Sequence, residues 1–139
     1  MTIRTIQDVE FGHELEPFTP ATSLSNTSAF ARAVGYDGSG RFEDHDKARA
    51  QGLPGALVPG IMGMAFLTSM IHSWSEVARV EKIDTVFRAP MLADHTLSIS
   101  AVVTDIDEDT GLVELDLAIK NAADETRVFG TANVRLPLV

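Results

Sequence analysis

The alternation of apolar and polar residues in the second half of the chain constrains the fold most strongly. Within Leu112–Lys120, every second residue from Val113 to Ile119 is apolar, and the residues between them are mostly charged. Successive side chains of a strand point to opposite faces of the sheet, so this pattern predicts an antiparallel strand with one buried face. Turn-forming residues separate three further runs that also predict strands: Val80–Phe87, Thr96–Ile106 and Thr126–Leu136.

The first half of the chain carries the signals of helices. Gly60 to about Val77 is apolar on most sides, so it predicts a long buried helix. Caps and periodicity predict three more elements: a strand from Val9 to about Ser23, a helix capped within Ser25–Thr27 and ending at Gly35, and a charged helix over His45–Gln51 capped by Asp44. Together these elements predict an α+β domain in which a curved antiparallel sheet wraps around the long helix.

Length, charge and composition limit the possible functions. With 139 residues, 45% of them hydrophobic, the chain is expected to form one domain, 1–139, that gains stability as an oligomer. A formal net charge of −9 repels a nucleic-acid backbone, so no nucleic-acid partner is expected. The absence of cysteine excludes disulfides, thiolate metal ligands and a cysteine nucleophile. Without a signal-peptide pattern or a long uninterrupted apolar run, we expect a cytoplasmic protein with no membrane partner.

The segment Asp37–Gly63 carries the most specific motif. It reads DGSGRFEDHDKARAQGLPGALVPGIMG: a polar loop, a short charged helix, a Gly-Pro turn and the start of the apolar helix. This layout resembles the MaoC-like hydratase/dehydratase family of the hotdog fold, whose signature is D-x-N-P-x-H, then A-R-A-x-G-x-P-G, then H-G-M. The resemblance extends over nearly the whole chain, from Val9–Gly12 to the closing Gly130–Val134. It implies a hotdog fold and an acyl-thioester substrate.

The motif departs from the family at its catalytic positions. Counting back without gaps from the Leu-Pro-Gly of the turn, the family's catalytic Asp falls on Asp37 and its catalytic His falls on Phe42. The His and Gly of H-G-M fall on Pro59 and Gly60. In a shortened loop, His45 would instead approach the position of the missing His. The resemblance therefore implies a retained frame with a broken acid/base pair.

Hydration of a 2-enoyl thioester needs a base for water, an acid for the α-carbon and donors for the enolate oxygen. Gly60 can supply such a donor, because the first N–H groups of a helix lack internal partners. The resemblance makes Asp37, His45 and Gly60 the candidate catalytic residues. It places the candidate substrate-binding residues at Arg41, Phe42, Pro59, Met62 and Arg88.

These residues also have simpler interpretations. Asp37 can be a turn former beside Gly38, and His45 can be a solvated surface residue. Arg88 can form a salt bridge, and Met62 can be core packing. His72, three and four residues from Ser69 and Thr68, is expected to be a hydrogen-bonded core histidine, and His13 and His95 are expected to be surface residues.

Three functional classes follow from the altered motif. The first is a hydratase/dehydratase acting on a CoA or carrier-protein thioester with altered acid/base residues. The second is a catalytically silent subunit that pairs with an intact MaoC-like chain, and the third is a repurposed hotdog cyclase or isomerase. We expect no cofactor and no metal, and a homodimer or a hetero-oligomer with an intact chain.

Overall fold

Four antiparallel strands form a sheet in the order β1-β4-β3-β2. The computed structural model of the chain describes residues 2–139. Its elements are the 3₁₀ helix η1 (Ile6–Asp8), the helices α1 (Leu24–Ala33), α2 (His45–Ala50) and α3 (Gly60–Trp74), and the strands β1 (Arg79–Phe87), β2 (Leu97–Asp107), β3 (Leu112–Asn121) and β4 (Thr126–Arg135). The four predicted strands are confirmed, each within one residue of its predicted bounds.

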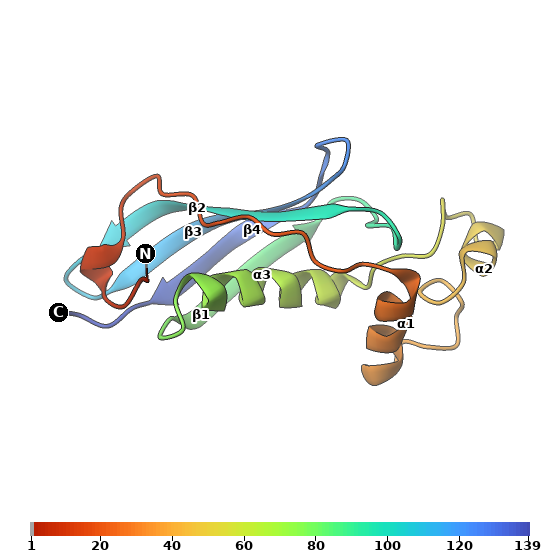
Figure 1. Ribbon diagram of the computed structural model, residues 1–139, viewed down its shortest axis with the longest axis horizontal. Coiled ribbons are helices and arrows are strands. Elements are labelled where there is room, and N and C mark those ends of the chain that lie inside the picture. The colour runs from red at the N-terminus through yellow and green to blue at the C-terminus, as the bar shows by residue number, and fades with distance from the viewer. Residues whose placement is uncertain (1) are drawn as a thin grey trace.

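Helix α3 lies along one face of this sheet (Figure 1). The alternation in β3 places Leu115 and Ile119 fully inside, where Leu67 and Ile71 of α3 meet them in the same core cluster. Burying the apolar face of a strand against a helix is the main favourable contribution to folding. The predicted hotdog architecture, a curved antiparallel sheet packed around a long helix, is therefore confirmed.

The N-terminal segment follows the outer side of β2 without forming the continuous strand predicted from Val9 to Ser23. Bridges join Glu14 to Val102 and Phe18 to Ile99, and η1 precedes them. The segment covers the β2 edge, because backbone N–H groups of both partners donate across it, including Leu15 to Ala101 at 2.9 Å. The opposite edge of the sheet is β1.

α1 and α2 end at Ala33 and Ala50, within two residues of the predicted Gly35 and Gln51, and the start of α1 and the end of α3 also differ from the prediction. α1 begins at Leu24 because the Ser23 hydroxyl accepts the Asn26 N–H at 3.2 Å, so the cap lies two residues before the predicted start of Ser25–Thr27. α3 ends at Trp74 instead of Val77, because the Ser75 backbone is extended and its hydroxyl donates to the Ile3 carbonyl at 2.7 Å.

The expectation that α3 is buried on most sides is also wrong. Its sheet side is buried, including Met62, Gly63 and Met70, but Ile61 is 38% exposed. His72 is exposed, and within residues 2–139 its ring has no hydrogen-bond partner, so it is not the predicted core histidine. One side of the helix is therefore open to solvent or to a partner.

The molecule has two distinct ends (Figure 1). Both termini and the C-terminal end of α3 lie at one end. Helices α1 and α2 lie at the other end, together with the N-terminus of α3. The Asp37–Gly63 motif is therefore gathered at a single end of the elongated domain.

Candidate functional site

The N-terminus of α3 is a bare helix end. Pro59 is its N-cap and provides no side-chain hydrogen bond, and the first helical bonds are made by Met62 and Gly63 to the Pro59 carbonyl. Within residues 2–139, the N–H groups of Gly60 and Ile61 have no acceptor. Such groups carry the positive end of the helix dipole, so they can bind an anionic or partly anionic oxygen.

The aromatic ring of Phe87 lies beside Gly60. A Cβ placed on Gly60 would lie 3.2 Å from Cε1 of Phe87, the last residue of β1. Phe87 itself is 50% exposed, so part of its ring faces outward. A free N–H pair next to an exposed ring can receive a polar oxygen joined to an apolar group.

The motif loop is tied to the segment that leads into α3. The Leu57 N–H donates to the Arg41 carbonyl at 2.8 Å, and the Gln51 amide donates to the Ser39 carbonyl at 2.6 Å. Phe42 stacks on Tyr36 with ring centroids 6.0 Å apart. The loop is thus an ordered structure that contains an aromatic pair, and the alignment of Phe42 with the motif histidine stays a prediction.

Asp37 lies exposed in this loop. Within the described part of the chain, its carboxylate has neither a hydrogen-bond donor nor a cationic partner within 4.0 Å. Glu43, in contrast, accepts the Gly38 N–H at 2.8 Å. Asp37 is therefore an unengaged carboxylate on the motif loop, and its catalytic role stays a prediction.

His45 is bound at both ring nitrogens. Its Nδ1 accepts the Ala56 N–H at 3.0 Å, and its Nε2 lies 2.7 Å from Oδ2 of Asp94. Since Nδ1 accepts, the proton of the neutral ring is assigned to Nε2, which donates to Asp94. The hydrogen bonds from His45 and from the Leu24 N–H hold the pKa of Asp94 below its ordinary value. His45 is not the isolated surface residue of the simpler interpretation, and its catalytic role stays a prediction.

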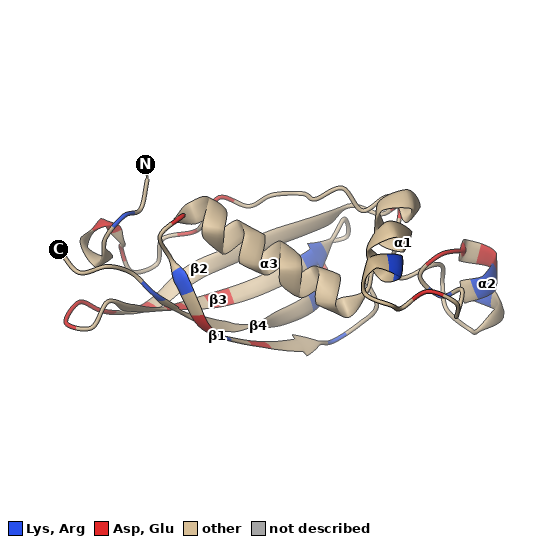
Figure 2. Ribbon diagram, turned by 90° about the horizontal axis from the view of Figure 1, so that it is seen from below, with Lys and Arg blue, Asp and Glu red and all other residues tan. Residues whose placement is uncertain are grey.

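Except for Lys82 in the first half of β1, the unpaired cations lie on segments near this end of the molecule. Five of the eleven Lys and Arg residues have no carboxylate within 4.0 Å among the described residues: Arg32, Arg41, Lys47, Lys82 and Arg88. Arg32 lies on α1 and Lys47 on α2, which form this end (Figure 2). Arg41 lies in the motif loop, and Arg88 directly follows Phe87. An anionic ligand would meet these side chains without competing carboxylates.

The remaining predicted binding residues are less accessible. Pro59 is buried, and Met62 is 8% exposed within the main core. In the described structure, Met62 therefore packs against the sheet, as its simpler interpretation expects. Its role in substrate binding stays a prediction.

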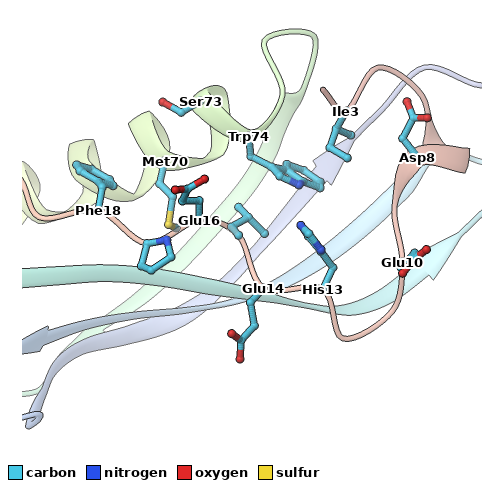
Figure 3. A pocket seen from close by; sticks show the side chains of 12 residues that line it. Ile3, Asp8, Glu10, His13, Glu14, Glu16, Phe18, Met70, Ser73 and Trp74 are labelled. Atoms are coloured by element: carbon cyan, nitrogen blue, oxygen red, sulfur yellow. The ribbon is translucent and has the colours of Figure 1, made fainter. Parts of the chain in front are cut away.

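A groove lies at the other end of α3 (Figure 3). It has a volume of about 830 Å³, with Trp74 and Met70 on one side and the N-terminal segment on the other. Four acidic residues line it, Asp8, Glu10, Glu14 and Glu16, and no Lys or Arg does. The like charge would repel a phosphate-bearing ligand, so this groove does not suit the predicted substrate.

Sequence reasoning did not single out two residues of the site. Asp94 is separated from His45 by 49 positions, and Phe87 reaches Gly60 only because β1 returns alongside α3. The only available signal was the Ala93–Leu97 turn, where the family usually has Gly-Asp-Thr-Leu and this chain retains the Asp.

Comparisons with known proteins agree on the fold. No protein-family model matches the sequence, and no curated protein matches it. The R-hydratase PhaJ1 of Pseudomonas aeruginosa has a TM-score of 0.87 at 17% identity, covering 97% of this chain and 86% of that one. A chain of the ChsH1–ChsH2 complex of Mycobacterium tuberculosis has a TM-score of 0.82 at 20% identity, covering 91% and 98%. The MaoC-like dehydratase of Rhodospirillum rubrum has a TM-score of 0.79 at 18% identity, covering 96% and 99%.

These likenesses confirm the resemblance that the motif predicted, at the level of the fold. The chain has the hotdog fold of R-hydratases and MaoC-like dehydratases. Within residues 2–139, no helix is long and apolar enough to cross a membrane.

Proposed function

We propose that this chain acts on an enoyl or 3-hydroxyacyl thioester as a hydratase/dehydratase-type hotdog protein, with the N-terminus of α3 as its site. The observation that carries the proposal is the pair of unpartnered N–H groups at Gly60 and Ile61 beside the exposed Phe87 ring. The thioester oxygen would accept the Gly60 N–H, and the acyl carbons would lie against the ring.

The proposed reaction needs few groups. A base removes a proton from water, the hydroxyl oxygen bonds to C3, and the electron pair of the C2=C3 bond moves toward the thioester oxygen. Gly60 N–H stabilises the negative charge that develops there. The proton then goes to C2. Asp37 is the proposed carrier of the proton in both steps, since its carboxylate is free to accept it and then to return it.

The substrate's carrier group fits the local charge. Coenzyme A and phosphopantetheine both carry phosphate. Because the whole chain has a formal net charge of −9, such a substrate needs cationic side chains close to the site. Arg88 directly follows Phe87 in the chain. The Arg41 carbonyl accepts a hydrogen bond from the N–H of Leu57, three residues before Gly60. These two unpaired guanidiniums are the proposed phosphate contacts, because Arg binds phosphate through paired N–H donors.

A second candidate function rests on the acid/base groups themselves. In the gap-free register Phe42 takes the position of the motif histidine, and both nitrogens of His45 are engaged. A chain that binds the thioester but transfers protons poorly would serve as a silent subunit beside an intact hydratase chain. One structural neighbour comes from a two-component complex, which makes such a pairing a reasonable alternative.

We propose that β1 forms the subunit interface. It is an edge strand, and Val86 and Phe87 near its end are each 50% exposed. Open strand edges readily pair with another chain. Antiparallel pairing of two copies centred on Ile83 would place Lys82 of each opposite Asp84 of the other. Opposite charges at directly opposed positions stabilise a strand pair, so a homodimer is the favoured assembly.

The decisive experiment is an absorbance assay of enoyl-thioester hydration by the purified chain, with Asp37→Asn alongside. Turnover that is lost in Asp37→Asn supports the hydratase proposal. Asp46→Asn is the matched control, because Asp46 is a highly exposed α2 residue whose carboxylate only pairs with Arg49. Thioester binding without turnover supports the silent subunit, and absence of both rejects the two proposals.

A further inference from the structure

Asp94 connects three segments that are distant in the sequence. Its Oδ1 accepts the N–H of Leu24, the first residue of α1, at 2.8 Å, and its Oδ2 lies 2.7 Å from Nε2 of His45, the first residue of α2. Its own N–H donates to the Thr22 carbonyl at 2.8 Å. The backbone has a φ of 67°, a left-handed conformation that Asp adopts more readily than most residues. Asp94 therefore holds α1 and α2 to the connection between β1 and β2.

His45 extends this network to the turn before α3. Its Nδ1 accepts the Ala56 N–H at 3.0 Å, while the Ala56 carbonyl accepts the Ala93 N–H at 2.9 Å. A Cβ on Gly55 would lie 3.1 Å from Nδ1, so the ring rests directly on the turn. The hydrogen bond that holds the Ala56 N–H thus depends on an imidazole nitrogen that carries no proton.

Apolar packing beneath the turn is limited. The local cluster consists of Ala48, Ala56 and Ala93, all fully buried, with Leu24 and Leu53 packed partly against it. Alanine side chains bury little apolar area, so hydrogen bonds supply a large share of the local stability. Loss of one bond should therefore be felt in this turn more than in the main core.

We propose that Asp94 is a positioning residue that, through His45, forms a proton-sensitive clamp on the turn leading to Gly60. By accepting from Nε2–H, Asp94 keeps the Nδ1 lone pair free for Ala56. The clamp itself is independent of the proposed function. Only the use of the clamp to position the Gly60 N–H for a thioester rests on the proposed function.

Protonation of His45 opens the clamp on one side. A doubly protonated imidazole is a donor at both nitrogens, so it keeps Asp94 but presents Nδ1–H to the Ala56 N–H. Two facing donors cannot bond, so Ala56 loses its bond to α2, while the Leu53 N–H to Ala48 and Arg49 to Pro54 bonds to α2 remain. Histidine side chains take up this proton between about pH 5 and pH 8.

Charged groups surround the ring on several elements. Asp94 faces it from the β1–β2 connection, and Asp44 adjoins it at the N-cap of α2. The guanidinium of Arg49 also lies close to Gly55, 4.0 Å from the position of a Cβ there, and pairs with Asp46. His95 directly follows Asp94 in the chain and lies near its carboxylate. Because several charged groups lie near the ring, the pH response of the clamp is measured on the signals of the His45 ring itself.

Nuclear magnetic resonance of the full chain tests the clamp without any substrate. The ring-nitrogen signals of His45 should show the Nε2–H form at pH 8. The exchange protection factor of the Ala56 N–H should fall about tenfold between pH 8 and pH 5, as expected for loss of one hydrogen bond. The Ile99 N–H, which donates to Phe18 at 2.9 Å in the sheet, should keep its protection.

Three variants separate the clamp from general loosening. His45→Gln keeps one acceptor and one donor but cannot titrate, so Ala56 protection should persist at pH 5. Asp94→Asn has a single side-chain acceptor and cannot serve both Leu24 and His45, so Ala56 protection should already fall at pH 8. Asp46→Asn removes the same charge from exposed α2 surface and should behave as the wild type.

Two results would overturn the clamp: an Nδ1–H ring in the wild type at pH 8, or the same pH-dependent loss in His45→Gln as in the wild type. If Asp94→Asn does not fold, the comparison of wild type with His45→Gln decides alone. A chain that hydrates no thioester but gives the expected exchange results rejects the proposed function and retains the clamp.

Discussion

Replacement of Gly60 by proline removes the N–H proposed to bind the thioester oxygen, with little expected change in the fold. Proline is accepted at the first position of a helix, where the N–H has no internal partner. The preceding Pro59 has φ −57° and ψ 138°, which is the extended conformation required before proline. Gly60 also has no positive φ that only glycine could adopt. The substitution is therefore compatible with the local backbone.

The expected effect is large on the reaction and small on stability. Loss of one donor to a developing oxyanion lowers kcat by about 10²–10³-fold, which corresponds to about 2.7–4 kcal/mol. The unfolding free energy should change by no more than about 1 kcal/mol, because no hydrogen bond of the described structure is lost. Gly60→Ala is the matched control, since its Cβ meets the Phe87 ring at 3.2 Å but its N–H remains.

The measurement is enoyl-thioester hydration followed by absorbance, with urea unfolding of each variant. Gly60→Ala should retain most of the wild-type rate, and Gly60→Pro should lose at least a hundredfold relative to it. Equal losses in both variants would mean that contact with Phe87 is responsible, and not the N–H. A Gly60→Pro variant as active as Gly60→Ala would refute the role of the helix N-terminus.

Three further predictions concern stability and assembly. The ion pairs of Glu81 with Arg135 and Arg79 lower the pKa of Glu81 from 4.5 to about 2, so they stabilise the fold above about pH 4.5, and this contribution is lost as the pH falls toward 2. The difference in urea midpoint between wild type and Glu81→Gln should therefore be present at pH 7 and absent near pH 2. A difference that does not change with pH would contradict this. Asp84→Lys should convert a dimer to a monomer in sedimentation, and adding Lys82→Asp should restore it; an assembly insensitive to both changes would exclude the proposed register. Gly130→Ala should lower the unfolding free energy by about 1–3 kcal/mol, because its Cβ would overlap the Asp84 carbonyl across β1 and β4; a wild-type urea midpoint would contradict that contact.

The sheet could be predicted from the sequence because its signal is local. Burial at Leu115 and Ile119 repeats with the period of the strand, so a short window is sufficient. The N-terminal segment could not be predicted as well, because two bridges to β2 hold it and pairing of that kind depends on distant residues. Likewise, the exposure of His72 depends on which side of α3 the sheet covers.

The candidate site also has parts that a local sequence signal predicts and parts that depend on distant residues. The Pro59–Gly60 helix start is a local signal and is confirmed as the beginning of α3. The partners of that helix end are not local, since Phe87 and Asp94 come from later segments. A polar residue at the start of a short helix, such as His45, gives no indication in the sequence of which distant carboxylate will bind it.

The most direct test of the central claim is to titrate the isotope-labelled chain with acyl-CoA thioesters and to follow the backbone amide signals. The proposed site predicts that the signals of Gly60 and Ile61 shift first and most. The indole signal of Trp74, the single tryptophan, should not move, because it reports on the acidic groove at the far end of α3. Shifts at Trp74 with none at Gly60 would place the ligand in that groove and contradict the account.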